Sequence, residues 1–105
     1  VGASPVFVDI DDYYHIDIDK IENAITDKTK AILFVDIYGQ SPDINKIIEI
    51  KNKHNLYLIE DAAQAFGSDY LDVSDSNMKK LGTTQGLITF KRLCCVPNFL
   101  IWING

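Results

Sequence analysis

A nearly uninterrupted apolar run at residues 30–37 is the feature that most limits the folds open to this 105-residue chain. The run reads Lys-Ala-Ile-Leu-Phe-Val-Asp-Ile, without the strict alternation of a strand that has one wet face. A strand buried on both faces is typical of a parallel sheet covered by helices. We therefore predict an α/β fold built around this segment.

Periodic segments on both sides of this run supply the other expected elements. Residues 5–10 and 56–59 are short and rich in strand-forming residues, whereas residues 18–26 and 44–53 carry apolar residues at helical spacing. Asp17 and Asp43 stand at favoured N-cap positions. The order strand, helix, strand, helix, strand predicts two consecutive βαβ units with helices packed on a parallel sheet. After Gly67 we expect a loop over 68–80 and one more strand over 86–90, whereas residues 91–105 have apolar content but no clear period.

Composition narrows the classes of function. The formal net charge is -5 and Lys/Arg residues form no run, which argues against nucleic-acid binding. No apolar run reaches the ~20 residues that a membrane span needs. The first ten residues lack the basic start and cleavage site of a signal peptide. The adjacent Cys94 and Cys95 indicate reduced thiols and no zinc site, and hence a cytoplasmic protein.

Two carboxylates interrupt apolar strands where a ligand would approach the sheet. Ligands of open parallel sheets bind beyond the carboxyl ends of the strands, and Asp36 and Asp61 stand at such ends. A buried carboxylate is costly unless it meets a cation or hydrogen-bond donors. Each aspartate therefore either binds a ligand or caps the backbone that follows it.

Small residues after Asp61 bear on that choice. Ala62, Ala63 and Ala65 leave room for a flat ligand, and Gln64 would share a face with Asp61 in a helical turn. A carboxylate and an amide over a floor of small residues suit a planar heteroaromatic ring. The same alanines would equally suit a tight contact between helix and sheet.

Residues 59–67, Ile-Glu-Asp-Ala-Ala-Gln-Ala-Phe-Gly, resemble the core motif of the DegT/StrS-type aminotransferases. Segments that precede this motif in the family are resembled, in the same order, by residues 2–10, 16–17, 21–26, 28–32 and 38–40, and residues 53–56 lead into it as in relatives. The resemblance covers residues 1–90. It implies that this part is the centre of the large domain of a fold-type-I enzyme, a three-layer α/β unit with a parallel sheet, and that residues 91–105 are a divergent tail.

The resemblance also implies a cofactor and a reaction. Members of this family use pyridoxal phosphate (PLP) to move an amino group, usually from glutamate, onto a nucleotide-linked keto sugar, in amino-sugar or cell-surface polysaccharide biosynthesis. Asp61 would pair with the pyridine nitrogen, and Gln64 would contact the phenolic oxygen of the ring. Ala63 would lie against the cofactor, and two copies of the chain would form a homodimer.

Departures from the family pattern bear on activity. Relatives usually carry histidine where this chain has Asp36. Lys91 falls at the position of a phosphate-binding serine, and Val96 falls near the position of the lysine that forms the Schiff base. Lys91 is the one candidate for a displaced Schiff-base lysine. The geometry that imine formation requires is tight, so we do not adopt Lys91 and assign no catalytic residue. We expect a piece that is inactive alone, with residues 91–105 read out of frame.

Two other readings stay open. The chain can be a non-catalytic remnant, or a small α/β binding domain unrelated to PLP chemistry. For the second reading, Asp9, Asp11 and Asp12 after the first strand suit Mg²⁺. A solvated acidic turn explains them as well and is preferred, so no metal site is predicted. A dinucleotide site is not expected, because no G-x-G-x-x-G follows a strand.

Overall fold

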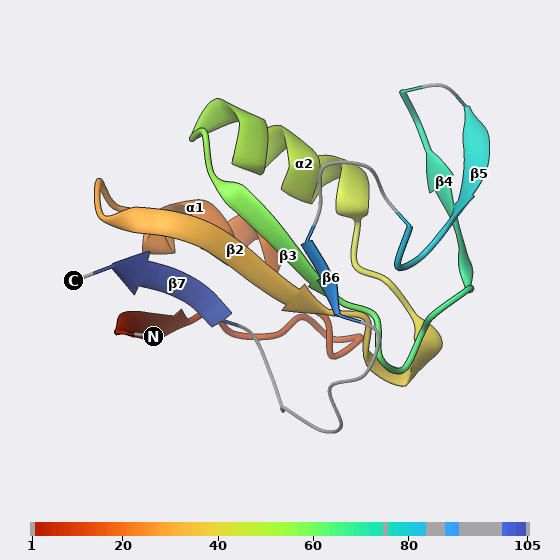
Figure 1. Ribbon diagram of the computed structural model, residues 1–105, viewed down its shortest axis with the longest axis horizontal. Helices are drawn as coiled ribbons and strands as arrows, with labels where there is room; N and C mark the ends of the chain where they lie inside the picture. Colours follow the sequence, from red (N-terminus) through yellow and green to blue (C-terminus); the bar gives the residue numbers. More distant parts are fainter. Residues whose placement is uncertain (1, 75, 84–87, 91–99, 105) are drawn as a thin grey trace.

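A mixed β-sheet carries the helices of this protein (Figure 1). The computed structural model describes residues 2–74, 76–83, 88–90 and 100–104. Its elements, in chain order, are β1 (Ala3–Phe7), α1 (Ile18–Ala24), β2 (Thr29–Val35), the short 3-10 helix η1 (Ile37–Gly39), α2 (Ile44–Lys53), β3 (Tyr57–Asp61), β4 (Asp69–Asp72), β5 (Asn77–Lys80), β6 (Ile88–Phe90) and β7 (Leu100–Asn104).

The sheet has the strand order β1-β7-β2-β3-β6. Strands β2 and β3 pair in parallel, as do β3 and β6. The predicted α/β class is confirmed, and so is the βαβ unit made of β2, α2 and β3. The strand expected over 86–90 is present as β6, within its described residues.

A further strand, β7, lies between the first strand and β2. Strand β1 begins at Ala3 and ends at Phe7, and it pairs antiparallel with β7 instead of lying beside β2. Strand β7 also pairs antiparallel with β2, so it separates the two. Its sequence, Leu-Ile-Trp-Ile-Asn, is rich in strand-forming residues but does not alternate, which is typical of a strand with a neighbour on each side. Within the tail that lacks a clear period, residues 100–104 thus form a strand.

The loop expected over 68–80 is instead a β-hairpin. Strands β4 and β5 pair antiparallel, and Tyr70 of β4 is buried in the core cluster. Asn45 of α2 holds the hairpin, since its side chain donates to Leu71 O at 3.0 Å and accepts from Val73 N at 3.2 Å.

Both predicted helix caps are confirmed. Asp17 accepts a hydrogen bond from Asp19 N at 3.2 Å, and Asp43 accepts one from Lys46 N at 3.3 Å. Helix α1 ends at Ala24, two residues before the predicted end. No helix in the described ranges has both the length and the apolar character needed to cross a membrane.

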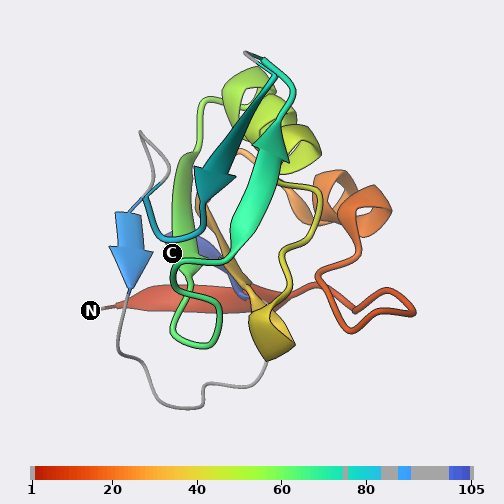
Figure 2. The same ribbon diagram turned by 90° about the vertical axis from the view of Figure 1, so that its right-hand side faces the viewer.

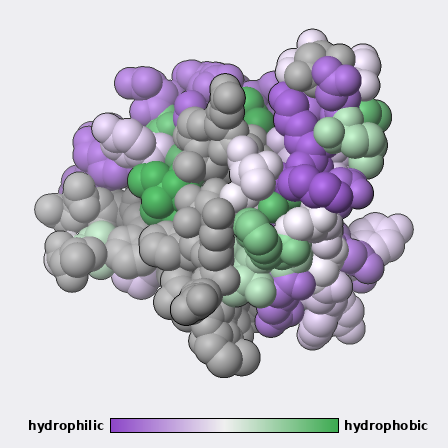
Figure 3. Space-filling view, turned by 45° about the vertical axis from the view of Figure 1, so that its right-hand side comes forward, coloured by the Kyte–Doolittle hydropathy of each residue, from purple (hydrophilic) through white to green (hydrophobic). Residues whose placement is uncertain are grey.

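The core lies between the sheet and one layer of helices. Its buried members come from both helices and from the sheet, and include Ile21, Ile32, Phe34, Ile47 and Leu58. Figure 2 shows α1 and α2 on the same face of the sheet, so the described part supplies two of the three layers expected. Figure 3 shows separate hydrophobic patches on one face, with hydrophilic side chains near its rim. Tyr57, Phe66 and Ile88 are among the exposed large apolar residues.

Candidate functional site

The register of β2 and β3 sets which way the acidic side chains at their ends point. Phe34 pairs with Glu60, and Val35 pairs with Asp61. Because paired residues of parallel strands share a face and successive residues alternate, Glu60 lies on the helix-covered face with Phe34. Asp61 therefore lies on the opposite face, at the carboxyl end of β3, where the sequence placed a ligand-binding group.

Asp61 is held in place by its backbone and by its carboxylate. Its side chain is buried, and one carboxylate oxygen accepts a hydrogen bond from Ala63 N at 3.1 Å. Its carbonyl oxygen accepts from Asp36 N at 3.0 Å, which joins the ends of β3 and β2. Asp61 thus binds a loop amide, as one of the two sequence-based readings requires, and the carboxylate is fixed before any ligand arrives.

Gln64 is brought to the same edge of the sheet by a long-range contact. Its side-chain carbonyl oxygen accepts a hydrogen bond from Tyr38 N at 3.0 Å. Tyr38 has a φ of 56° and Gly39 a φ of 79°, so η1 turns its amide toward Gln64 through backbone that favours glycine. The Tyr38 ring lies edge-on to Tyr14, with centroids 6.1 Å apart. Sequence analysis missed Tyr38, because its contact with Gln64 spans 26 residues.

Asp36 and Glu60 form a buried acidic pair on the helix-covered face. Both side chains are fully buried, and Glu60 accepts a hydrogen bond from Gly82 N at 3.1 Å. Among the described residues, neither carboxylate oxygen of Asp36 has a hydrogen-bond partner. Burial, and then the negative charge of Glu60, raise the pKa of Asp36 to about 8.

A hollow of about 460 Å³ lies between the start of α2 and the hairpin. Ser41, Asp43, Asp69 and Tyr70 are among its lining residues, whereas Asp61 and Gln64 are not. The carboxylates of Asp43 and Asp69 make this hollow a poor site for a phosphate group, since like charges repel. It is therefore not part of the candidate cofactor site.

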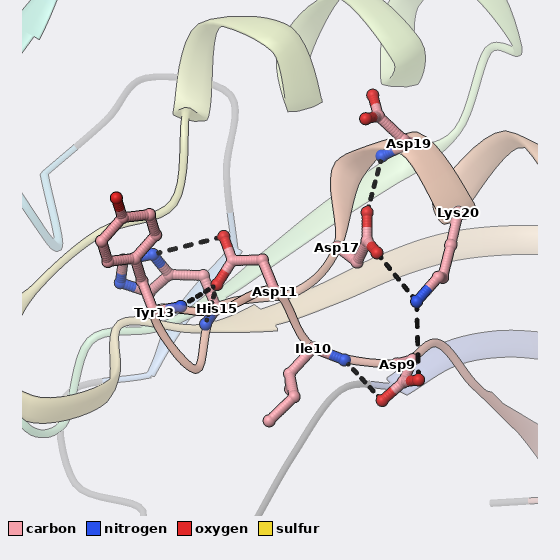
Figure 4. A network of polar contacts seen from close by, with 8 residues as sticks. All are labelled: Asp9, Ile10, Asp11, Tyr13, His15, Asp17, Asp19 and Lys20. Carbon is pink, nitrogen blue, oxygen red and sulfur yellow. Dashed lines mark hydrogen bonds and ion pairs between the residues drawn. The ribbon is translucent and has the colours of Figure 1, made fainter.

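The acidic turn after β1 is a network within the protein (Figure 4). Asp9 accepts from Ile10 N at 2.9 Å and pairs with Lys20, whereas Asp11 accepts from the amides of Tyr13 and His15. In the described ranges no group of three or more His, Cys, Asp or Glu side chains could hold a metal ion. Asp9 and Asp11 therefore stabilise the loop after β1 through hydrogen bonds and an ion pair within the protein.

The remaining sequence-based candidates cannot be placed. Lys91, Val96, Cys94 and Cys95 lie outside the described residues. The structure thus brings Asp61, Ala63 and Gln64 to one edge of the sheet and adds Tyr38 to them.

Comparisons with known proteins agree on one family. The chain is 42% identical over 90 residues to GDP-perosamine synthase of Escherichia coli O157:H7, covering 85% of this chain and 23% of that protein. It is 44% identical over 86 residues to UDP-2-acetamido-2-deoxy-3-oxo-D-glucuronate aminotransferase of Pseudomonas aeruginosa, covering 81% of this chain and 24% of that protein. The chain therefore spans about a quarter of the length of these curated relatives.

A solved structure and a family model agree with these relatives. The crystal structure of NtdA from Bacillus subtilis with bound cofactor PMP superposes with a TM-score of 0.58 at 43% identity, covering 68% of this chain and 16% of NtdA. The model of the DegT/DnrJ/EryC1/StrS aminotransferase family, whose members depend on PLP, matches residues 1–91. On the strength of this match and of the relatives above, this chain belongs to the DegT/DnrJ/EryC1/StrS aminotransferase family.

Proposed function

We propose that the chain is the middle of the large domain of a PLP-dependent aminotransferase for a nucleotide-linked keto sugar. The observation that carries this proposal is the buried Asp61 carboxylate, fixed at the carboxyl end of β3 beside a turn of small residues. In this proposal Asp61, Ala63 and Gln64 contact the cofactor.

The residues at this edge fit the pyridine side of PLP. Asp61 is an acceptor for a protonated ring nitrogen, and its fixed carboxylate keeps the proton there. Gln64 accepts from Tyr38 N with its carbonyl oxygen, which leaves its NH₂ group as the donor for the phenolic oxygen. Ala63 presents only a methyl group. When bound, PLP supplies an electron sink for breaking a bond at the amino-bearing carbon.

The remaining features of the proposal come from the family. The relatives above are named for nucleotide-sugar substrates, and this supports the same substrate class here. Glutamate as amino donor, a homodimer and a cytoplasmic location belong to the proposal, as does the division into residues 1–90 and a divergent tail of 91–105. We assign no Schiff-base lysine within the described residues.

Titration with PLP tests the assignment of Asp61. The Asp61→Asn variant should bind PLP about tenfold or more weakly, because a hydrogen bond to a charged group contributes about 1.5–3 kcal/mol. The measurement is PLP absorbance at rising protein concentration. Asp27→Asn is the matched control, since Asp27 is exposed and precedes β2, at the other end of the strand. Equal affinity of both variants would remove Asp61 from the site.

Borohydride reduction followed by mass mapping tests the lysine. A stable PLP adduct on Lys91 would place the Schiff base in this chain and make the chain itself competent for imine formation. Reversible PLP binding with no adduct, or with labels scattered over surface lysines, would agree with our assignment of no Schiff-base lysine here.

A further inference from the structure

Asp36 and Glu60 place two carboxyl groups together in the protein interior. Each is fully buried, at the ends of the neighbouring parallel strands β2 and β3. The charged groups that act on Asp36 from the packed elements described are Glu60 and Asp61, both acidic and both on β3. The Ser41 hydroxyl, from the segment before α2, opposes their effect and donates its hydrogen bond to Pro42 O.

Two ionised carboxylates cannot share such a site at an acceptable cost. A buried charge loses its hydration, and a second like charge beside it adds repulsion, so one of the two groups keeps its proton. Glu60 already has a backbone donor, because one of its oxygens accepts from Gly82 N. Asp36, whose oxygens have no donor among the described residues, is the better acid.

We propose that Asp36 is a neutral carboxylic acid beside the buried Glu60, and that this pair positions Asp61 for the pyridine nitrogen of PLP. The connection is short: Asp36 N holds Asp61 O at 3.0 Å, and Glu60 precedes Asp61 in β3. Glu60, which accepts a hydrogen bond from Gly82 N, also holds the turn that follows β5. Asp36 is thus a positioning residue, which does not itself reach the cofactor, and its role rests on the proposed function of Asp61.

The protonation can be tested without any cofactor. At pH 7 exposed carboxyl groups are ionised, so the infrared carbonyl band of a protonated carboxylic acid should mark Asp36. The band should disappear with a midpoint near pH 8, and it should be absent from Asp36→Asn at pH 7. Asp72→Asn is the matched control: Asp72 is a buried carboxylate paired with Lys79, and its replacement should leave the band unchanged.

The link to Asp61 is tested by the pH dependence of PLP binding. Wild-type affinity for PLP should weaken between pH 7 and pH 9 by about tenfold more than the affinity of Asp36→Asn. Only the wild type can lose the Asp36 proton in this range, and pH 9 lies about one unit above the midpoint of that loss. Titration of PLP itself affects both proteins equally.

The outcomes separate the two proposals. Absence of the band at pH 7, or its persistence in Asp36→Asn, would overturn the neutral acid, whether or not PLP binds. Parallel pH profiles of the two proteins would overturn the positioning role alone. If Asp36→Asn does not fold, the pH titration of the wild-type band decides the first point, and the wild-type binding profile decides the second through its midpoint. Failure of PLP to bind, with the band present, would count only against the proposed function and the link that depends on it.

Discussion

Gly67 and Gly82 flank the hairpin with the same backbone handedness but with different surroundings. Gly67 has a φ of +87° and open space where a Cβ would stand. Gly82 has a φ of +78°, and a Cβ there would lie 2.7 Å from the Phe66 ring. Gly82 also donates to the buried Glu60. The two positions therefore separate backbone strain from steric contact.

Replacing each glycine by alanine should show this difference. Gly67→Ala should lower the free energy of unfolding by about 1–2 kcal/mol, the cost of a left-handed residue with a Cβ. Gly82→Ala should cost more, because Phe66 must rotate away and the hydrogen bond to Glu60 is disturbed. Urea unfolding of both variants measures the gap. Equal losses would show that the exposed Phe66 ring moves aside freely.

At this scale the sequence could predict Asp61 and Gln64 but not the residues behind them. Asp61 breaks an apolar strand, and that interruption is visible in a sequence. Glu60 stands next to it, and its burial on the helix-covered face follows only from strand parity and from the register with β2. Tyr38 could not be found, because a backbone amide carries no sequence signal.

Helix α2 is the element that joins the sheet to the hairpin. It begins at Ile44 behind the Asp43 cap, buries Ile44 and Ile47, and holds β4 through Asn45. Loss of the cap would loosen the turn that leads from η1 as well as the helix itself.

The cap makes a direct prediction. Asp43→Ala should lower the free energy of unfolding by about 1 kcal/mol, because Lys46 N loses its acceptor. Asp43→Ser is the matched control and should retain most of the stability, since serine also caps helices. Chemical denaturation measures both. An alanine variant as stable as the serine variant would mean that water replaces the cap at no cost.

Elements with local signals were predicted, and those defined by distant partners were not. Both helices have periodic apolar residues and a capping aspartate, and β2 has its continuous apolar run. The hairpin was missed because residues 68–80 are mostly polar, and the burial of Tyr70 is visible only in the fold. Strand β7 was missed because its place between β1 and β2 depends on segments about a hundred residues apart in the chain, such as the pair Ala3 and Asn104.

For the molecule as a whole, two buried carboxyl groups set opposite responses to pH. The pKa of Asp36 is raised to about 8, so the folded state keeps a proton that the unfolded state releases near pH 4. The pKa of Asp72 is lowered to about 2 by Lys79 and Ser74, so its contribution is lost as pH falls toward that value. The contribution of Asp36 to stability is therefore present at acid pH and is lost as the pH rises toward 8. The contribution of Asp72 is present near neutral pH and is lost as the pH falls toward 2.

Stability should accordingly fall as pH rises from 5 to 8. Because the folded state binds one extra proton at Asp36, the free energy of unfolding should fall by about 1.4 kcal/mol per pH unit, and this decline should end above pH 8. Urea unfolding across this range gives the slope. In Asp36→Asn the decline should be reduced by that amount, and an unchanged decline would assign it to other groups.

The place of β7 has a consequence for the order of folding. Strand β1 reaches β2 only through β7, and the pair Ala3 and Asn104 joins segments about a hundred residues apart. The unit of β2, α2 and β3 can assemble first, from contacts close in sequence. Strand β1 should therefore be the last of these strands to join the sheet, because closing so long a loop costs more entropy than closing the short ones.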